Sequence, residues 1–179
     1  MEKMRISPSS WKISLRQLLS QQAPKSKIAI IGIGNTFRSD DAAGNLVAHA
    51  LLECRFIRDL EHVLVMDSGH APENSTAKLR CFAPSIVLLI DAAEMNELPG
   101  TIRWIGMDEL DGMSASTHSM PLSMLARYLT LELDCEIKLL GIQPQSNDVG
   151  ESVSSPVLKS VGEISDALID LLCETEPVY

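Results

Sequence analysis

Short apolar runs alternate with amphipathic segments along most of the chain. After residue 26 the compact runs are rich in Ile, Val and Leu, which is typical of buried strands. The predicted strands are Lys27–Ile33, His62–Met66, Ser85–Ile90, Thr101–Met107 and Glu136–Ile142. Apolar residues at helical spacing predict helices over Asp41–Glu53, over Pro121–Leu131 and from Ser155 onward. This interleaving predicts a three-layer α/β/α fold with a twisted, mainly parallel five-stranded sheet and helices on both faces.

The first 26 residues have a different pattern. Ser9 or Ser10 can cap a short helix that ends near Pro24. Its apolar stripe consists of Trp11, Leu15, Leu18 and Leu19. We therefore expect an N-terminal arm over residues 1–26 and a single α/β domain over residues 27–179. Two roles are open for the arm: it can cover one edge of the core, or it can contact a partner.

Composition narrows the range of partners. The chain has 15 Lys plus Arg against 24 Asp plus Glu, a net charge of -9, so we expect neither nucleic acid nor an anionic membrane as a partner. The N-terminal region has no continuous apolar stretch, so we expect neither a signal peptide nor membrane insertion. The cysteines are far apart and form no C-x-x-C pair, which fits free thiols in a reducing compartment. We therefore expect a cytoplasmic protein.

Polar residues that can carry chemistry follow the predicted strands. In an open α/β sheet, ligands bind outside the carboxyl ends of the strands, so these residues are expected to converge on one rim. They are Asn35, Asp40 and Asp41 after the first strand, Asp67, His70 and Glu73 after the second, Asp91 and Glu94 after the third, and His118 before the helix near Pro121.

Three of these residues form a candidate metal or acid/base site. Asp41, Asp91 and His118 offer two oxygen donors and one nitrogen donor from separated loops, a set that suits a borderline divalent ion with open positions. Each residue alone also has a structural explanation, as a helix cap, a turn residue or a packed side chain. Their predicted convergence is what favours a functional site.

The segment Gly32-Ile-Gly34 also has to be compared with a nucleotide-binding loop. The dinucleotide fingerprint requires a third glycine where this chain has Phe37. Asp40 and Asp41 would place negative charge where a pyrophosphate needs amide donors. A dinucleotide site is not expected, and a metal-free nucleotide-binding domain remains a rival that a titration with nucleotides would test.

Five segments in order carry a resemblance to a known family. They are Gly32-Ile-Gly-Asn-Thr-Phe-Arg-Ser-Asp-Asp-Ala-Ala-Gly44, Asp67-Ser-Gly-His-Ala-Pro-Glu-Asn74, Asp91-Ala-Ala-Glu-Met95 with Pro99-Gly100, Thr117-His-Ser-Met-Pro-Leu122 and Leu140-Gly-Ile-Gln-Pro144. The chain resembles the hydrogenase maturation endopeptidases, most closely those that serve formate-hydrogen-lyase-type complexes. These proteases remove the C-terminal extension from the large-subunit precursor of nickel-iron hydrogenases after nickel insertion.

The resemblance implies a role for each matching residue. Asp41, Asp91 and His118 hold the positions of metal ligands and catalytic residues. Asn35, Asp67 and Glu73 match positions around the cleft and are the expected substrate-binding residues. The implied partner is the hydrogenase large-subunit precursor, and the implied metal is nickel that the substrate supplies.

Several mechanisms use the same residues. In the first, the bound nickel polarises the scissile carbonyl or acidifies a water, so that substrate recognition and catalysis share one ion. In the second, an aspartyl protease mechanism, the two carboxylates activate water without a metal. A third reading is a non-proteolytic metal-sensing binding protein or chaperone of the precursor.

Overall fold

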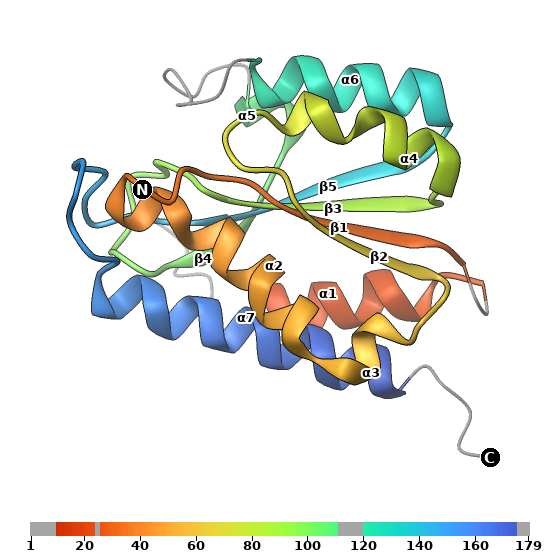
Figure 1. The fold of residues 1–179 in the computed structure, drawn as a ribbon, viewed down its shortest axis with the longest axis horizontal. Helices are drawn as coiled ribbons and strands as arrows, with labels where there is room; N and C mark the ends of the chain where they lie inside the picture. Colours follow the sequence, from red (N-terminus) through yellow and green to blue (C-terminus); the bar gives the residue numbers. More distant parts are fainter. Residues whose placement is uncertain (1–9, 24–25, 111–119, 175–179) are drawn as a thin grey trace, which may run out of the picture.

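The computed structural model describes residues 10–23, 26–110 and 120–174. These residues form a five-stranded sheet with helices on both faces, as the sequence predicts (Figure 1). The strands are β1 (Ile28–Gly32), β2 (Val63–Asp67), β3 (Ile86–Ala92), β4 (Ile102–Ile105) and β5 (Glu136–Ile142). Their order across the sheet is β2-β1-β3-β5-β4. β1, β2, β3 and β5 run parallel, and only β4 pairs antiparallel, with β5.

Helices connect most of the strands. They are α1 (Ser10–Ser20), α2 (Ala43–Glu53), α3 (Arg55–Arg58), α4 (Thr76–Phe82), α5 (Met107–Leu110), α6 (Leu122–Leu133) and α7 (Ser155–Glu174), with 3-10 turns η1 (Ser39–Ala42) and η2 (Pro72–Ser75). The prediction omitted α3, α4 and α5. These helices have four, seven and four residues, too few for an apolar stripe to repeat along the helix.

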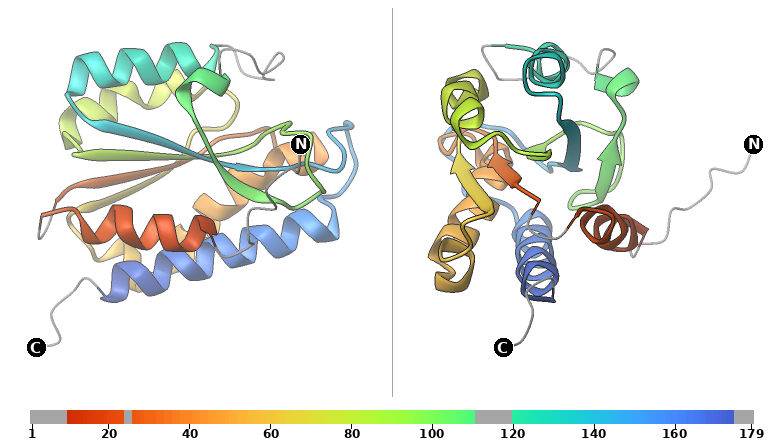
Figure 2. Two further views of the ribbon diagram at one scale, coloured as in Figure 1. Left: turned by 180° about the vertical axis from the view of Figure 1, so that it is seen from behind. Right: turned by 90° about the vertical axis from the view of Figure 1, so that its right-hand side faces the viewer.

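Two hydrophobic clusters fill the space between the helices and the sheet. Alternate residues of each central strand enter opposite clusters, because successive strand side chains point to opposite faces. Ile30 and Leu88 belong to the cluster that also holds residues of α1, α2 and α7. Ile31 and Leu89 belong to the cluster under α4 and α6. The end-on view in Figure 2 shows the two helix layers on either side of the sheet.

α1 contributes to the first of these clusters. Trp11, Leu15 and Leu19 are buried in it, and the helix contacts α7 and β4. The indole Nε1 of Trp104, on β4, donates a hydrogen bond to the backbone oxygen of Trp11 at 3.3 Å. α1 is therefore part of the hydrophobic core.

Two further sequence expectations concern membrane-spanning helices and the state of the cysteines. Within the described ranges, no helix combines the length and the apolar composition needed to cross a membrane. Cys54, Cys81, Cys135 and Cys173 are all free thiols, which agrees with the expectation from their spacing.

Candidate active site

The loops at the carboxyl ends of the parallel strands hold the predicted site residues that the structure describes. We call this region the carboxyl edge: residues 33–42, 68–75, 93–101 and 143–154, together with the last residues of β2 and β3. In Figure 1, α2, α4, α6 and α7 all begin on the side where these strands end. Gly32 is in register with Asp67 on one side and with Ile90, the neighbour of Asp91, on the other. The end of β1 therefore lies between two strands that carry an acid at their last residue, Asp67 in β2, or one residue before it, Asp91 in β3.

Asp41 lies in the 3-10 turn η1, immediately before α2, and only 3% of it is exposed. Its backbone oxygen accepts a hydrogen bond from the Asn35 amide at 3.1 Å. Gly34 packs so closely on this turn that a Cβ there would lie 1.8 Å from the Asp41 oxygen, and its φ of +149° also favours glycine. The glycine therefore lets the loop fold tightly around the Asp41 backbone.

Asp91 lies within β3, one residue before its end, and is also only 3% exposed. The prediction placed it just after the strand, but β3 extends to Ala92. The first turn of α2 packs on this strand, because a Cβ at Gly44 would lie 2.1 Å from the Ile90 oxygen. Since η1 also contacts β3, the fold brings Asp41 and Asp91 into adjoining segments.

Two buried carboxylates in adjoining segments can perform specific chemistry. Burial of a charged group is costly unless hydrogen bonds, an ion pair or a cation compensate for it. Carboxylate oxygens are suitable ligands for a divalent cation, and they can also accept a proton from water. The arrangement therefore fits both of the proteolytic mechanisms that the sequence leaves open.

His118, the third predicted ligand, falls in residues 111–119 and so lies outside the described residues. The nearest described helix on its C-terminal side is α6, which begins at Leu122. Among the described residues there is no group of three or more His, Cys, Asp or Glu side chains that could hold a metal ion. The three-ligand set thus remains a prediction.

Asp67, at the end of β2, has well-defined partners. Its carboxylate accepts hydrogen bonds from Asn45 Nδ2 at 2.6 Å and from the Gly69 amide at 2.9 Å, and it pairs with His49 Nε2 at 2.6 Å. Burial alone would raise the pKa of this carboxyl, but the hydrogen bonds from Gly69, Asn45 and His49 outweigh burial and lower the pKa. Asp67 therefore joins α2 to the end of β2, and 29% of its side chain remains exposed.

Sequence reasoning did not assign a role to Asn45 or His49. They are four residues apart in α2, so they lie on one face of the helix. Their four-residue spacing, in the helix that directly follows the acidic loop, is the signal that could have identified them.

Asn35 and Glu73 lie in the segments that follow β1 and β2, respectively. Asn35 Oδ1 accepts a hydrogen bond from the Phe37 amide at 3.0 Å, which shapes the loop after β1. Glu73 is half-buried in η2. The two loops are joined by a hydrogen bond from the Gly34 amide to the Gly69 oxygen at 3.0 Å. Both residues thus lie at the carboxyl edge, and contact with a substrate is a prediction for each.

Asp40 has a structural role that the sequence analysis did not identify. It is fully buried, and its carboxylate accepts hydrogen bonds from the amides of Gln145, Ser146 and Ser154 at 2.7, 3.1 and 2.6 Å. The Ser154 hydroxyl donates another at 2.9 Å. Burial favours the neutral acid, but the hydrogen bonds from Ser154, Gln145 and Ser146 outweigh it and lower the pKa of Asp40. Asp40 thereby holds the loop between β5 and α7.

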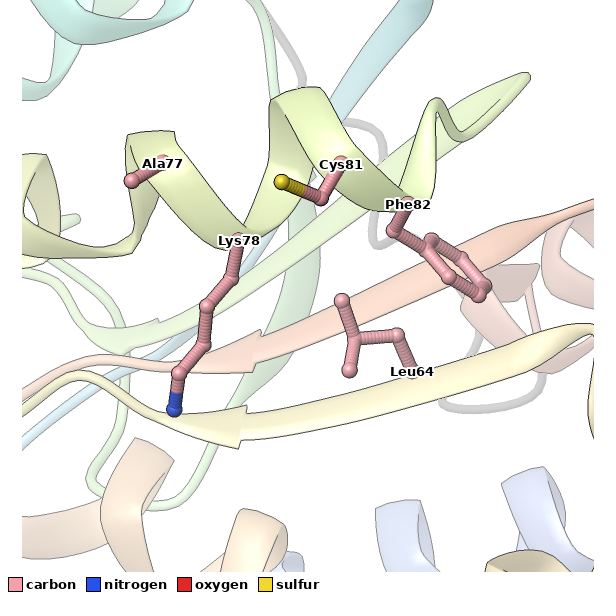
Figure 3. Close-up of a pocket in the computed structure, with 5 residues that line it drawn as sticks. All are labelled: Leu64, Ala77, Lys78, Cys81 and Phe82. Atoms are coloured by element: carbon pink, nitrogen blue, oxygen red, sulfur yellow. The ribbon is translucent and has the colours of Figure 1, made fainter.

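A cavity of about 470 Å³ lies elsewhere, between α4 and β2 (Figure 3). Its lining residues are Leu64, Ala77, Lys78, Cys81 and Phe82. None of the predicted site residues lines it. Leu64 is near the amino end of β2, whereas Asp67 ends that strand, so the cavity is separate from the candidate site.

The fold is thus an open α/β sheet with buried acids at its carboxyl edge, where ligands bind in proteins of this class. The profile of the hydrogenase maturation protease family, HycI type, matches residues 47–174. The hydrogenase 3 maturation protease of Escherichia coli K12 is 33% identical over 140 residues, covering 78% of this chain and 86% of that protein. The chain therefore belongs to the hydrogenase maturation protease family, and it is a peptidase.

Other relatives agree with this assignment. A Methanocaldococcus jannaschii protein, provisionally named a hydrogenase maturation protease, is 33% identical over 162 residues, covering 88% of this chain and 92% of that protein. The crystal structure of the [NiFe] hydrogenase maturation protease HycI from Thermococcus kodakarensis KOD1 superimposes with a TM-score of 0.80 at 29% identity. The match covers 89% of this chain and 99% of that one, so the two proteins share the same fold.

Proposed function

We propose that this peptidase removes the C-terminal extension from the large-subunit precursor of a nickel-iron hydrogenase after nickel has been inserted. Family membership supports the substrate class, since the relatives are named for hydrogenase maturation. The observation that carries the proposal is the burial of Asp41 and Asp91 in adjoining segments of the carboxyl edge. With its net charge of -9, the chain has no charge complementarity with nucleic acid.

In this proposal the nickel of the substrate is the recognition element. Asp41, Asp91 and His118 bind it, and the open positions are left to substrate ligands and a water. The ion can then polarise the scissile carbonyl or lower the pKa of the water. Asn35, Asp67 and Glu73 contact the polypeptide around the cleavage site. The free thiols support a reducing, cytoplasmic compartment for this reaction.

The direct test compares two forms of one precursor. The purified protein is incubated with nickel-loaded precursor and with the same precursor lacking nickel, and the product masses are measured. We expect rapid removal of a C-terminal peptide from the loaded form and little or none from the other. Equal processing of both forms would contradict nickel recognition, and recovery of the loaded precursor at unchanged length would contradict the proposed substrate.

A further inference from the structure

Gln143 is a buried amide directly after the last residue of β5, and only 4% of it is exposed. Its Oε1 accepts hydrogen bonds from the backbone amides of Met95 and Glu97 at 2.7 and 3.2 Å. Its Nε2 donates to Glu94 Oε1 at 2.9 Å and to the Pro144 oxygen at 3.1 Å. Both ends of the side chain are therefore used, as is expected of a buried amide with a fixed orientation.

These bonds hold the loop that follows Asp91. Residues 94–97 begin three positions after Asp91, and Gln143 bonds to backbone or side-chain atoms of three of these four residues. Backbone hydrogen bonds continue the same contact: the Gly100 amide donates to the Gln143 oxygen at 2.8 Å, and the Gln143 amide donates to the Thr101 oxygen at 2.9 Å. The chain leaving β3 is thus fastened to the end of β5.

The same short segment is fastened to the loop that carries Asp41. The Asp40 carboxylate accepts hydrogen bonds from the amides of Gln145 and Ser146, and the Asp40 amide donates to the Ser146 oxygen at 3.1 Å. Residues 143–146, which we call the brace, therefore bond on one side to the loop after Asp91 and on the other to the neighbour of Asp41.

We propose that Gln143 is a positioning residue of the peptidase, which acts through the brace to fix Asp41 and Asp91 relative to each other; this inference rests on the proposed function. Its side chain contacts the loops and is buried away from solvent. Catalytic groups have to be held within about 0.5 Å of their productive geometry, and a misplacement of about 1 Å can reduce the rate on the order of 100-fold. The brace follows β5 and bonds to the loop after β3, which is the neighbour of β5 in the sheet, and to η1. It can therefore provide this restraint.

Two substitutions separate positioning from simple stability. Gln143→Met keeps the length of the side chain but removes its hydrogen bonds to Glu94, Met95, Glu97 and Pro144. We expect kcat for the nickel-loaded precursor to fall about 10- to 100-fold with KM nearly unchanged, because an interaction that orients the reacting groups acts on the chemical step.

Gln143→Glu keeps an acceptor for the Met95 and Glu97 amides and loses the donor. We expect an intermediate kcat that recovers as the pH falls, because a protonated carboxyl can again donate to Glu94.

The matched control is Leu168→Ala, which removes a fully buried side chain of α7 in the cluster on the opposite side of β5 from Met95. It lowers the melting temperature and should leave kcat unchanged well below that temperature. If Gln143→Met also has wild-type kcat, the inference is wrong. A fall of kcat in both variants in proportion to their lost stability would likewise overturn it.

A measurement without substrate tests the brace separately from the proposed function. Hydrogen exchange of the Met95 and Glu97 amides, relative to amides within β3, should become faster in Gln143→Met and stay at the wild-type ratio in Leu168→Ala. If the wild-type protein fails to process the precursor, the proposed function fails, and the exchange rates still decide the brace. Unchanged exchange at Met95 and Glu97 would overturn it, and faster exchange would support it.

Discussion

The two neighbouring acids of the first loop have different environments. Asp40 is turned into the protein, where its carboxylate accepts hydrogen bonds from residues more than 100 positions later in the chain. Asp41 lies in the same turn, adjoining β3, where Asp91 is buried. Identical side chains one residue apart thus serve loop anchoring and the candidate site, because successive residues of a tight turn point in different directions.

The stability that Asp40 contributes should depend on pH. Its folded pKa is lowered, so its contribution to the free energy of unfolding is present above the unfolded Asp pKa of about 3.9 and is lost as the pH falls through the folded pKa. We expect Asp40→Asn to lower the free energy of unfolding at pH 7 by an amount on the order of 2 kcal/mol, since hydrogen bonds to a charged group are lost. The difference from wild type should shrink below about pH 4.

Urea unfolding of both proteins at several pH values measures this difference. Asp166→Asn, at an exposed position of α7, is the control and should stay close to wild type at pH 7. A stability loss for Asp40→Asn that is the same at pH 3 and pH 7 would contradict the anchoring role of the charged carboxylate.

The proteolytic mechanisms are separated at the predicted site residues. Asp41→Asn and Asp91→Asn should each abolish processing of nickel-loaded precursor under either mechanism. His118→Ala should abolish it only if the histidine binds the substrate nickel, since two carboxylates that activate water without a metal do not need it. Peptide release measured by mass spectrometry decides between them, with His62→Ala as a histidine control. Full activity of His118→Ala would exclude the three-ligand proposal.

At the scale of elements, the β1 to α2 connection is defined by close backbone packing. Gly32, Gly34 and Gly44 each lie where a Cβ would come within 2.1 Å of a backbone oxygen. α2 therefore lies directly on the sheet next to the candidate site. The glycine spacing that resembles a nucleotide loop has a different purpose here, which is to let the helix and strand approach.

A pair of glycine substitutions tests this packing. In Gly44→Ala the new methyl group would meet the Ile90 and Ile33 oxygens at 2.1 and 2.3 Å, and backbone atoms cannot move aside easily. We expect a loss of about 1–3 kcal/mol or more in the free energy of unfolding. Gly162→Ala, in α7 with nothing within 4 Å of its Cβ position, should instead stabilise the protein by about 0.5–1 kcal/mol. Thermal melts compare the two, and equal melting temperatures would contradict the close approach.

At the scale of the whole molecule, α1 closes the core on the side of β4 and α7. Its buried stripe lies in the same cluster as the central strands, so the first described helix supports the sheet that carries the site. The cavity between α4 and β2 is lined mainly by apolar side chains and lies apart from the candidate site.

Two residues of α1 provide a matched test of this support. Leu15 is fully buried, and Ile13 is 57% exposed on the same helix. We expect Leu15→Ala to reduce the free energy of unfolding by about 2–5 kcal/mol. Ile13→Ala should change it by no more than about 0.5 kcal/mol. Chemical denaturation of the wild type and of both variants, with a single cooperative transition in each, measures these free energies of unfolding. An equally small effect of Leu15→Ala would show that α1 is not part of the cooperative unit.

The sequence alone was sufficient for the five strands, the long helices and the family. Runs of β-branched residues and helical periodicity are local signals, and they placed Asp41, Asp67 and Asp91 after three predicted strands. In the structure Asp41 lies in η1, and Asp67 and Asp91 lie in the last two residues of β2 and β3. The sequence did not reveal that β4 is antiparallel, that Asp67 pairs with Asn45 and His49, or that Asp40 and Gln143 fasten three loops together. Those contacts join residues far apart in the chain and follow no period. Only the tertiary structure decides them, because a loop hydrogen bond depends on where the packed sheet places its two partners.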